Sequence, residues 1–445
     1  MKIIFILLDD LGWNDVGINN PLINTPNICN LSQEACTLER NYAFSVCGPT
    51  RAMIQTGIYA YKYGMQKLLS PWNYYGLDPK LKLIPDYLKV LGYESFAIGK
   101  WHLGHNNRKW LPNKRGYKLH YGNLTGCINH VSHLNCGSNI HDFSCNTKPI
   151  HKKGHFCDIL TEKAIEIIEE NKDNKFFMYL AYNSPHTPHM CPAQFEEKYS
   201  GPKKTYYGMI SHLDYNLGKI FSKLKDLNIF DDTIIWLQSD NGGWTINQGD
   251  NYPLRDGKTS FYDGGTKVFT ILKNKNINIK KFKGFTHSVD VLPTLVDFAG
   301  GDPDEIKLDG ISINKYLTND SNPERILIIA FYSEIFWCFI INNLKFINEN
   351  GKMQCYDLLA DPNEKSNIIS KNYENFKSKI TKTIEECKKT HVLDPDLYNQ
   401  SREICDVKYW GQRVKKSIMM QNCSNPDKKV HETFLSLSGY DIFYQ

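Results

Sequence analysis

The chain has 445 residues, 41% of them hydrophobic and 13% aromatic, which is enough for one large domain and a smaller one. Its formal net charge is +5 and no dense Lys/Arg block occurs, which is compatible with an anionic substrate and far too weak to argue for nucleic acid. No apolar run approaches the roughly 18 residues that span a membrane, so we expect no membrane span.

The predicted elements begin with a buried strand over Ile3–Leu8, a continuous run rich in β-branched residues. A loop rich in proline and asparagine and a short helix from Cys47 follow, and residues 105–157 are expected to be mainly loop. The other elements, in chain order, are a helix over Leu83–Leu91, a strand over Ser95–Ile98, a helix over Ile159–Asn171, a strand over Phe176–Tyr182, a helix over Tyr206–Leu227, strands over Thr233–Leu237 and Val268–Leu272, and a helix over Ser288–Ala299. This alternation predicts an α/β fold with a large, mostly parallel sheet and helices on both faces.

The pattern changes beyond about residue 320. Short apolar runs at Ile326–Phe331, Trp337–Ile341 and Leu344–Asn348 predict antiparallel strands, and a charged helix is expected near Tyr373–Lys389. We therefore divide the chain into three parts. They are a large domain over residues 1–320, a smaller C-terminal α+β domain over residues 321–412, and a tail over residues 413–445 of uncertain structure.

Polar side chains follow four of the predicted strands. They are Asp9 and Asp10, Lys100 and His102, His186, and Asp240 and Asn241. Ligands in open α/β sheets bind beyond the carboxyl ends of the strands, so we expect these side chains in one crevice. Any one acidic pair could be a helix cap or a turn, but three carboxylates and an amide oxygen together favour Ca²⁺ or Mg²⁺ over zinc.

The segment from Cys47 to Arg51 predicts a site for an oxyanion. Pro49 stands where a first helical residue is expected, and Gly57 stands where a helix would stop. Cys47 then lies at the mouth of a helix, where partial positive charge favours a thiolate or a bound anion. Arg51 is one turn further on and can reach the same point. These residues alone leave open whether Cys47 is a nucleophile or an inert thiol.

Histidine and lysine residues are not singled out by chemistry alone. The chain has 14 histidines, and a lone histidine is more often structural than catalytic. Only their positions after predicted strands distinguish His102 and His186 from the others. Lys258 lies in a glycine-bearing loop and would usually face solvent, and Arg255 and Lys267 are equally available there.

Several segments resemble the type I sulfatases. Cys47–Gly57 is similar to the family signature C-x-P-S-R followed by x-x-x-L-T-G, with Thr50 for the usual Ser and Gln55 for the usual Leu. Five further segments resemble sulfatase segments in the family's order: Ile6–Asp15, Gly99–Gly104, Ser184–His186, Ser239–Gly243 and the lysine loop Pro253–Gly265. Together they cover about residues 1–300. Their details are closest to the B-type arylsulfatases, the N-acetylgalactosamine-4-sulfatase branch.

The resemblance implies an alkaline-phosphatase-like fold and a hydrolase that removes sulfate from a sulfated sugar or an aryl sulfate. It implies one Ca²⁺ per chain, and a formylglycine made from Cys47 by the formylglycine-generating enzyme. The implied Ca²⁺ ligands are Asp9, Asp10, Cys47 as formylglycine, Asp240 and Asn241. The implied sulfate-handling residues are Cys47, Arg51, Lys100, His102, His186 and Lys258. Two alternatives stay open: a phosphodiesterase or phosphonate hydrolase of the same superfamily, and a non-catalytic protein that binds sulfated glycans.

Cysteines and sequons bear on the compartment. Thirteen cysteines without a C-x-x-C pair argue against a zinc module, and we expect a disulfide between Cys136 and Cys145. Five N-x-S/T sequons suit either a glycoprotein or plain surface loops: Asn30, Asn123, Asn319, Asn399 and Asn422. Ile3–Leu8 is too short for a signal-peptide core, so we expect no signal peptide in this chain. The resemblance nevertheless implies that the protein enters the secretory pathway and is lysosomal or secreted. It also implies a glycosaminoglycan as a substrate.

Overall fold

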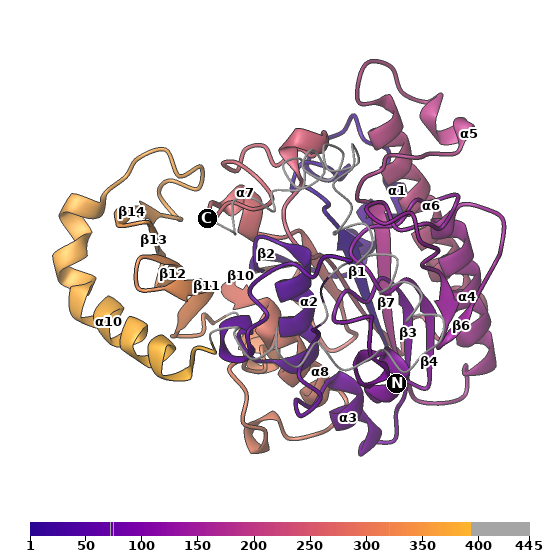
Figure 1. Cartoon of the computed structure of the whole chain (residues 1–445), viewed down its shortest axis with the longest axis horizontal. Helices are drawn as coiled ribbons and strands as arrows, with labels where there is room; N and C mark the ends of the chain where they lie inside the picture. The colour runs from indigo at the N-terminus through magenta and orange to yellow at the C-terminus, as the bar shows by residue number, and fades with distance from the viewer. Residues whose placement is uncertain (72, 74, 320, 393–445) are drawn as a thin grey trace, which may run out of the picture.

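A ten-stranded sheet organises the computed structural model, which describes residues 1–392 except 72, 74 and 320 (Figure 1). The strand order is β10-β2-β9-β8-β1-β7-β3-β4-β5-β6. The strands are β1 (Lys2–Asp9), β2 (Cys36–Tyr42), β3 (Glu94–Gly99), β4 (Leu119–Gly122), β5 (Ser144–Cys145), β6 (Lys148–Pro149), β7 (Phe176–Pro185), β8 (Thr233–Ser239), β9 (Thr270–Lys273) and β10 (Lys281–His287). The central strands β8, β1, β7, β3 and β4 are parallel, and β9 is antiparallel to both of its neighbours. The predicted large, mostly parallel sheet is confirmed.

Helices cover both faces of this sheet, and β1 shows why. Its residues alternate between two hydrophobic cores, with Phe5 in one and Ile6 in the other, so neither face of the strand meets water. One face carries α2 (Cys47–Thr56), α3 (Ile84–Lys89) and α8 (Val291–Phe298). The other carries α1 (Pro26–Glu34), α4 (Phe156–Glu170) and α6 (Lys204–Asp226). The short helices α5 (Ala193–Glu196), α7 (Asp263–Thr266) and α9 (Asn314–Asn319) lie in connecting segments.

A small antiparallel sheet follows the large one. It consists of β11 (Ile326–Ser333), β12 (Phe336–Ile341), β13 (Leu344–Glu349) and β14 (Lys352–Asp357). The helix α10 (Ile369–Thr390) packs on it, with the rings of Phe376 and Phe346 5.5 Å apart. The predicted C-terminal sheet and helix are confirmed, whereas the domain boundaries stay a prediction. The predicted tail over residues 413–445 lies outside the described residues.

A buried ion cluster fastens the small sheet to the large domain. Lys345 of β13 is fully buried, and its ammonium group contacts the carboxylates of Asp263 in α7 and Glu364 at 2.9 Å. The same group donates a hydrogen bond to the carbonyl oxygen of Phe261 at 3.1 Å. Burial raises the pKa of Glu364 to about 7, although Lys345 opposes the shift. Because Asp263 follows the loop that carries Lys258, this cluster also anchors that loop.

Replacing Lys345 by methionine is expected to destabilise the protein strongly. The methionine would fill the space but leave two carboxylates buried without a cation, at a cost of about 3–5 kcal/mol in the free energy of unfolding. Urea unfolding of the variant and the wild type measures the difference. Lys352→Met, at an exposed position on β14, is the control and should stay within about 1 kcal/mol of the wild type. Equal stability of the two variants would contradict this account of the cluster.

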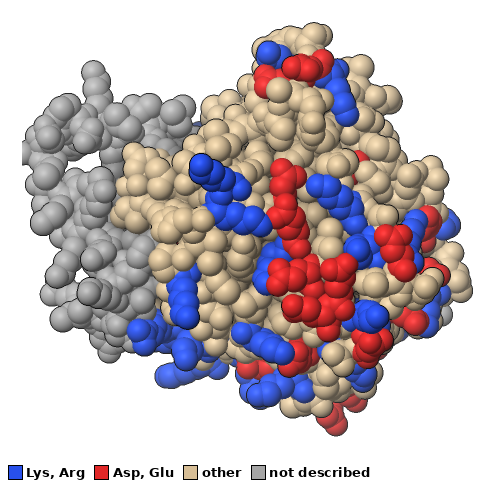
Figure 2. Space-filling model, turned by 90° about the vertical axis from the view of Figure 1, so that its right-hand side faces the viewer, with Lys and Arg blue, Asp and Glu red and all other residues tan. Residues whose placement is uncertain are grey.

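The surface over α4 and α6 carries both signs of charge side by side (Figure 2). Lys223 of α6 pairs with Glu169 of α4 at 2.7 Å, and Lys152 pairs with Glu162 of α4 at 2.6 Å. Such mixed charge is typical of a solvated surface. Within the described part of the chain, no helix has both the length and the apolar character needed to cross a membrane.

Candidate active site

The polar residues that follow β1, β3, β7 and β8 meet at one end of the sheet, as predicted. Asp9 and Asp10 leave β1, and Asp240 and Asn241 leave its neighbour β8, where the backbone N–H of Asp10 donates to Oδ1 of Asp240 at 3.2 Å. Asp9, Asp10, Asp240 and Asn241 are all buried. Arg51, Lys100 and Lys258 reach the same place, so the structure brings together every residue of the predicted metal and sulfate sites.

Each of the three carboxylates has a cationic partner. Nζ of Lys100 lies 2.9 and 2.7 Å from the two carboxylate oxygens of Asp9. Nζ of Lys258 lies 2.7 Å from Oδ2 of Asp10. Arg51 donates from Nε and Nη2 to Oδ2 of Asp240, at 3.0 and 2.7 Å. Three negative and three positive groups therefore lie paired at buried positions.

The pKa values of Asp240 and Asp10 are shifted in opposite directions. Burial and the nearby charge of Asp9 raise the pKa of Asp240 to about 6, although Arg51 and Lys100 oppose them. Burial acts in the same direction on Asp10, but Lys258 and His186 hold the pKa of that carboxyl below its usual value. Asp240 thus lacks full compensation for its charge in this arrangement.

Cys47 is the first residue of α2, and its Sγ lies within 4.8 Å of carboxylate oxygens of Asp9 and Asp240. The helix begins two residues before Pro49, earlier than predicted, and it ends at Gly57 in the left-handed conformation, φ 67°, as predicted. The side chain of Cys47 is buried, and burial raises the pKa of its thiol even though Lys100 and Lys258 oppose this. The neutral thiol is therefore favoured, and the thiolate that the helix end suggested is not.

The hydrogen bonds of His102 define its tautomer and which ring nitrogen faces Cys47. Its Nδ1 lies 3.3 Å from Sγ of Cys47, and its Nε2 lies 2.9 Å from the carbonyl oxygen of Leu69. A carbonyl oxygen only accepts hydrogen bonds, so Nε2 carries the proton and Nδ1 presents a lone pair to Cys47. Burial and the charge of Lys100 lower the pKa of His102 well below its usual value, which keeps the ring neutral.

His186 approaches the carboxylates from the end of β7. Its Nδ1 lies 2.6 Å from the carbonyl oxygen of Thr187, so Nδ1 donates to that carbonyl. Its Nε2 points the other way, 3.6 Å from Oδ2 of Asp10. This nitrogen is the one available to a ligand.

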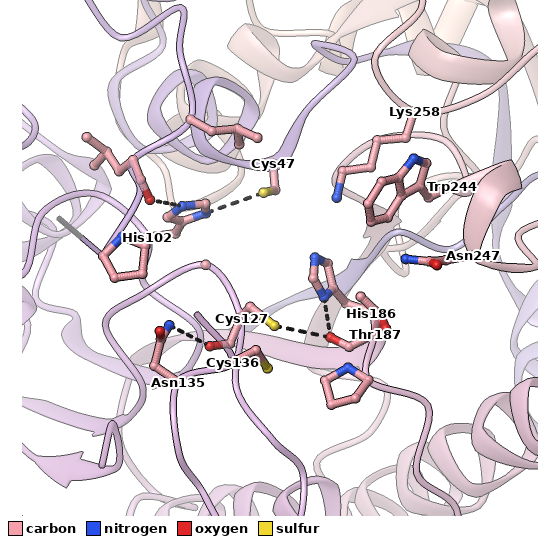
Figure 3. A pocket seen from close by; sticks show the side chains of 15 residues that line it. Cys47, His102, Cys127, Asn135, Cys136, His186, Thr187, Trp244, Asn247 and Lys258 are labelled. Atoms are coloured by element: carbon pink, nitrogen blue, oxygen red, sulfur yellow. Dashed lines mark hydrogen bonds between the residues drawn. The ribbon is translucent and has the colours of Figure 1, made fainter. Parts of the chain in front are cut away.

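Above these groups lies a cavity of about 280 Å³ (Figure 3). Cys47, His102, His186 and Lys258 lie at its charged end, and Trp244, from the loop after β8, forms part of its wall. Sequence reasoning missed Trp244, although it directly follows the Ser239–Gly243 segment. It also missed Leu69, whose backbone carbonyl sets the His102 tautomer and leaves no signal in the sequence.

The two departures from the signature fit the fold. The hydroxyl of Thr50, in the first turn of α2, lies 3.2 Å from the carbonyl oxygens of Phe44 and Val46, either of which can accept its hydrogen bond. Oε1 of Gln55 accepts a hydrogen bond from the hydroxyl of Tyr117 at 2.7 Å. Neither side chain contacts the carboxylates, so the substitutions leave the site's charge unchanged.

The residues present suit a hard divalent cation. Asp9, Cys47 and Asp240 offer one ligand atom each within 4.8 Å of one another, and so do Asp9, Asp10 and His186. Oδ1 of Asn241 is buried among these groups and has no hydrogen-bond partner within the described part of the chain. An unpartnered buried oxygen beside three carboxylates is the donor set that Ca²⁺ takes.

The family comparison agrees with this geometry. A family model described as Sulfatase matches residues 2–301 of this chain, which is well over half of it. The chain belongs to the sulfatase family. Arylsulfatase J of Mus musculus is 30% identical over 345 residues, which are 74% of this chain and 57% of that protein. N-acetylgalactosamine-6-sulfatase of Homo sapiens is 27% identical over 293 residues, 60% of this chain and 55% of that protein. The chain thus spans little more than half the length of these curated relatives.

Solved structures extend the similarity to most of the chain. The crystal structure of Ps i-CgsB is 28% identical, has a TM-score of 0.79, and covers 94% of this chain and 97% of that one. Phosphonate monoester hydrolase of Agrobacterium radiobacter is 18% identical with a TM-score of 0.64, over 88% of this chain and 96% of that one. The second match shows the alkaline-phosphatase-like fold alone. The type I sulfatase family is confirmed, while the B-type branch stays a prediction.

The predicted Cys136–Cys145 disulfide and the predicted character of the Asn123 sequon were both wrong. Cys136 and Cys145 are free thiols, and Cys136 lines the cavity beside Cys127, whose thiol donates to the carbonyl oxygen of Thr187 at 3.3 Å. Cys145 instead lies in the short strand β5, opposite Tyr121. The sequon at Asn123 is neither a glycan site nor a surface loop, because its side chain is fully buried and donates to the carbonyl oxygen of Thr125. Asn399 and Asn422 lie outside the described residues.

In protein from an oxidising host, we expect Cys136 to form a disulfide with Cys127, because these two side chains are neighbours in the cavity wall (Figure 3). Trypsin leaves all three cysteines on the peptide 119–152, because the Lys148–Pro149 bond resists it, and a protease that cuts before Asp142 separates Cys145 from the other two. The fragment 119–141 should then resist alkylation until it is reduced, while 142–152 is alkylated at once. A covalent link between the two fragments would show the Cys136–Cys145 pairing instead.

Proposed function

We propose that this sulfatase-family protein is a sulfuric ester hydrolase of the arylsulfatase type, acting with a formylglycine made from Cys47 and one Ca²⁺. The observation that carries the proposal is the placement of Cys47. It lies at a helix N-terminus between His102 and His186, beside three buried carboxylates and three cations. Positive groups around one nucleophile position suit a tetrahedral oxyanion such as sulfate.

The ion pairing supports a divalent cation at this site. Lys100, Lys258 and Arg51 are now held by the carboxylates, so no positive charge is left over for a sulfate group. Ca²⁺ held by Asp9, Asp10, Asp240 and Asn241 would supply the missing charge and acidify a hydroxyl of residue 47. Lys100 and Lys258 would then be released to bind the oxygens of the sulfate.

The roles of the two histidines follow from their hydrogen bonds. Hydrated formylglycine offers two hydroxyls, one to attack the sulfur and one to expel the sulfate afterwards. Nδ1 of His186 is committed to the carbonyl oxygen of Thr187, so Nε2 is the nitrogen from which the ring would protonate the leaving alcohol. His102 presents the lone pair of Nδ1 to residue 47, so it takes the proton of the second hydroxyl.

We further propose a sulfated sugar or an aryl sulfate as the substrate, and maturation by the formylglycine-generating enzyme in the secretory pathway to a lysosomal or secreted protein. The names of the relatives support a sugar sulfate. One matched protein is an N-acetylgalactosamine-6-sulfatase. Another crystal structure of Ps i-CgsB, 27% identical to this chain, contains k-i-k-neocarrahexaose. The B-type arylsulfatase activity, on a 4-sulfated N-acetylgalactosamine, belongs to the same proposal.

The test keeps 4-nitrophenolate as the leaving group and changes the group that is transferred from it. We expect 4-nitrophenyl sulfate to be hydrolysed in the presence of Ca²⁺ at least about 100-fold faster than 4-nitrophenyl phenylphosphonate and bis(4-nitrophenyl) phosphate. A preference for the phosphonate or the phosphodiester would identify a hydrolase of the other class. Binding of sulfate esters without turnover of any of the three compounds would identify a non-catalytic protein.

A further inference from the structure

The wall of the cavity carries little charge away from the sulfate end. Among the described residues, Lys258 is the only lysine, arginine, aspartate or glutamate that lines the cavity, and it is paired with Asp10. Leu68, Leu69 and Pro71 form one apolar wall. A carboxylate or a second sulfate on the substrate would therefore lose its water in this cavity without gaining a cation.

Trp244 lines the same cavity. Its side chain is 7% exposed, and Nζ of Lys258 lies 5.2 Å from the centre of its ring, so the indole borders the group that would bind sulfate. Figure 3 shows Trp244 beside Lys258 and across the cavity from Cys127 and Cys136. Its backbone is held in place, because its carbonyl oxygen accepts hydrogen bonds from the N–H groups of Asn247 at 2.9 Å and Gly249 at 3.0 Å.

Few polar groups in the cavity are free to bind a ligand. The amide of Asn135 is fully used, since its Nδ2 donates to Thr125 and Cys127 and its Oδ1 accepts from Gly137 and Ser138. Asn247 lies one turn from Trp244 and its side chain has no partner among the described residues. A flat apolar surface with one uncommitted neutral amide matches a ring that has an apolar face and a neutral hydrogen-bonding edge.

We propose that the cavity selects sulfate esters of a single ring that bears no further charge, with the ring stacked on Trp244 and its polar edge on Asn247. The inference rests on the proposed sulfatase activity and narrows its substrate class. Aryl sulfates and monosulfated neutral hexoses fit it, and esters with a uronate next to the sulfated ring do not. The glycosaminoglycan substrate expected from the resemblance is thereby disfavoured.

The first test changes one charge on the substrate. The probe is N-acetylgalactosamine 4-sulfate linked to glucuronate, compared with the same disaccharide after methyl esterification of the carboxylate. We expect kcat/KM to rise about tenfold or more on esterification, because the charge is removed while the size barely changes. Equal or faster turnover of the free uronate would overturn the inference.

The second test changes the wall. Trp244→Ala should raise KM for 4-nitrophenyl sulfate about tenfold and leave kcat within about twofold, while Trp244→Phe keeps most of the affinity. Ile246→Ala is the matched control, because Ile246 is 68% exposed in the same loop and does not line the cavity. An unchanged KM in Trp244→Ala, with normal hydrolysis by the wild type, would overturn the inference and leave the proposed function intact.

A binding measurement separates the two proposals. Cys47→Ala protein cannot turn over, so calorimetry with 4-nitrophenyl sulfate reports affinity alone. We expect the double variant Cys47→Ala, Trp244→Ala to bind about tenfold more weakly than Cys47→Ala. If the wild type hydrolyses no sulfate ester, the proposed function fails, yet this difference would still support the ring-stacking wall. Equal affinities would overturn it.

Discussion

Asp240→Asn is expected to lower kcat/KM for sulfate esters by about 10³-fold or more and to abolish Ca²⁺ binding in the low micromolar range. Burial raises the pKa of Asp240 to about 6, so its ionised form is disfavoured in this arrangement and a divalent cation would stabilise it. Asparagine keeps an oxygen for Arg51 but loses the charge. Alanine would also remove activity, yet it would leave the fully buried Arg51 with only the more distant carboxylate of Asp9, at 3.5 Å, and confound the result with unfolding.

The measurement is calcium content and affinity by calorimetry, together with the hydrolysis rate before and after treatment with a strong chelator. Asp290→Asn is the matched control, because Asp290 is also a buried aspartate paired with an arginine, Arg325, away from the cavity. It should bind Ca²⁺ like the wild type. Full activity in chelator, or unchanged Ca²⁺ binding by Asp240→Asn, would remove the metal from the proposal.

The sequence was sufficient for the central strands and not for the edge. β1 and β8 are continuous apolar runs because both of their faces are covered, and such runs are visible in any sequence. β2 carries Glu39 and Arg40 at half-buried positions near the sheet edge, where it pairs with β10, so its composition is that of a loop. The helix α1 was missed for a related reason, since only Ile28 and Leu31 of its nine residues are buried.

The same division holds in the site. Asp9, Lys100, His186 and Asp240 were found because each follows a strand, and parallel strands bring their carboxyl ends together. The pairing of Lys100 with Asp9 depends on distances that no spacing in the sequence encodes.

The residues that line the cavity could not be predicted from the sequence for another reason. Trp244, Leu69 and Cys127 lie in segments without regular periodicity, and only the folded chain shows which face of each segment lines the cavity. Gly126 illustrates this, because a side chain there would collide with the ring of His102, so its role is to let the Cys127 loop approach the histidine.

Active protein is expected to carry formylglycine at position 47, and Cys47→Ser is expected to lose turnover by roughly 10⁴-fold or more. A serine has almost the size of the residue it replaces, but it offers one hydroxyl and not two. After attack on sulfur it would remain a sulfate ester, because no second hydroxyl is present for His102 to deprotonate. The loss should therefore appear after a single turnover, with one equivalent of alcohol released per site.

Peptide mass spectrometry decides the matter. Trypsin releases Asn41–Arg51, in which sulfur should be replaced by a carbonyl oxygen that hydrazides capture. Ser45→Ala is the control variant, because Ser45 lies on the same peptide and its hydroxyl has no hydrogen-bond partner among the described residues. It should keep both modification and activity.

The neutral, buried thiol of unmodified Cys47 is a poor nucleophile by itself, so unmodified Cys47 in fully active protein would contradict the mechanism. Unmodified Cys47 in inert protein that still binds sulfate esters would establish the binding-only alternative. A partly converted sample should show activity in proportion to its formylglycine content.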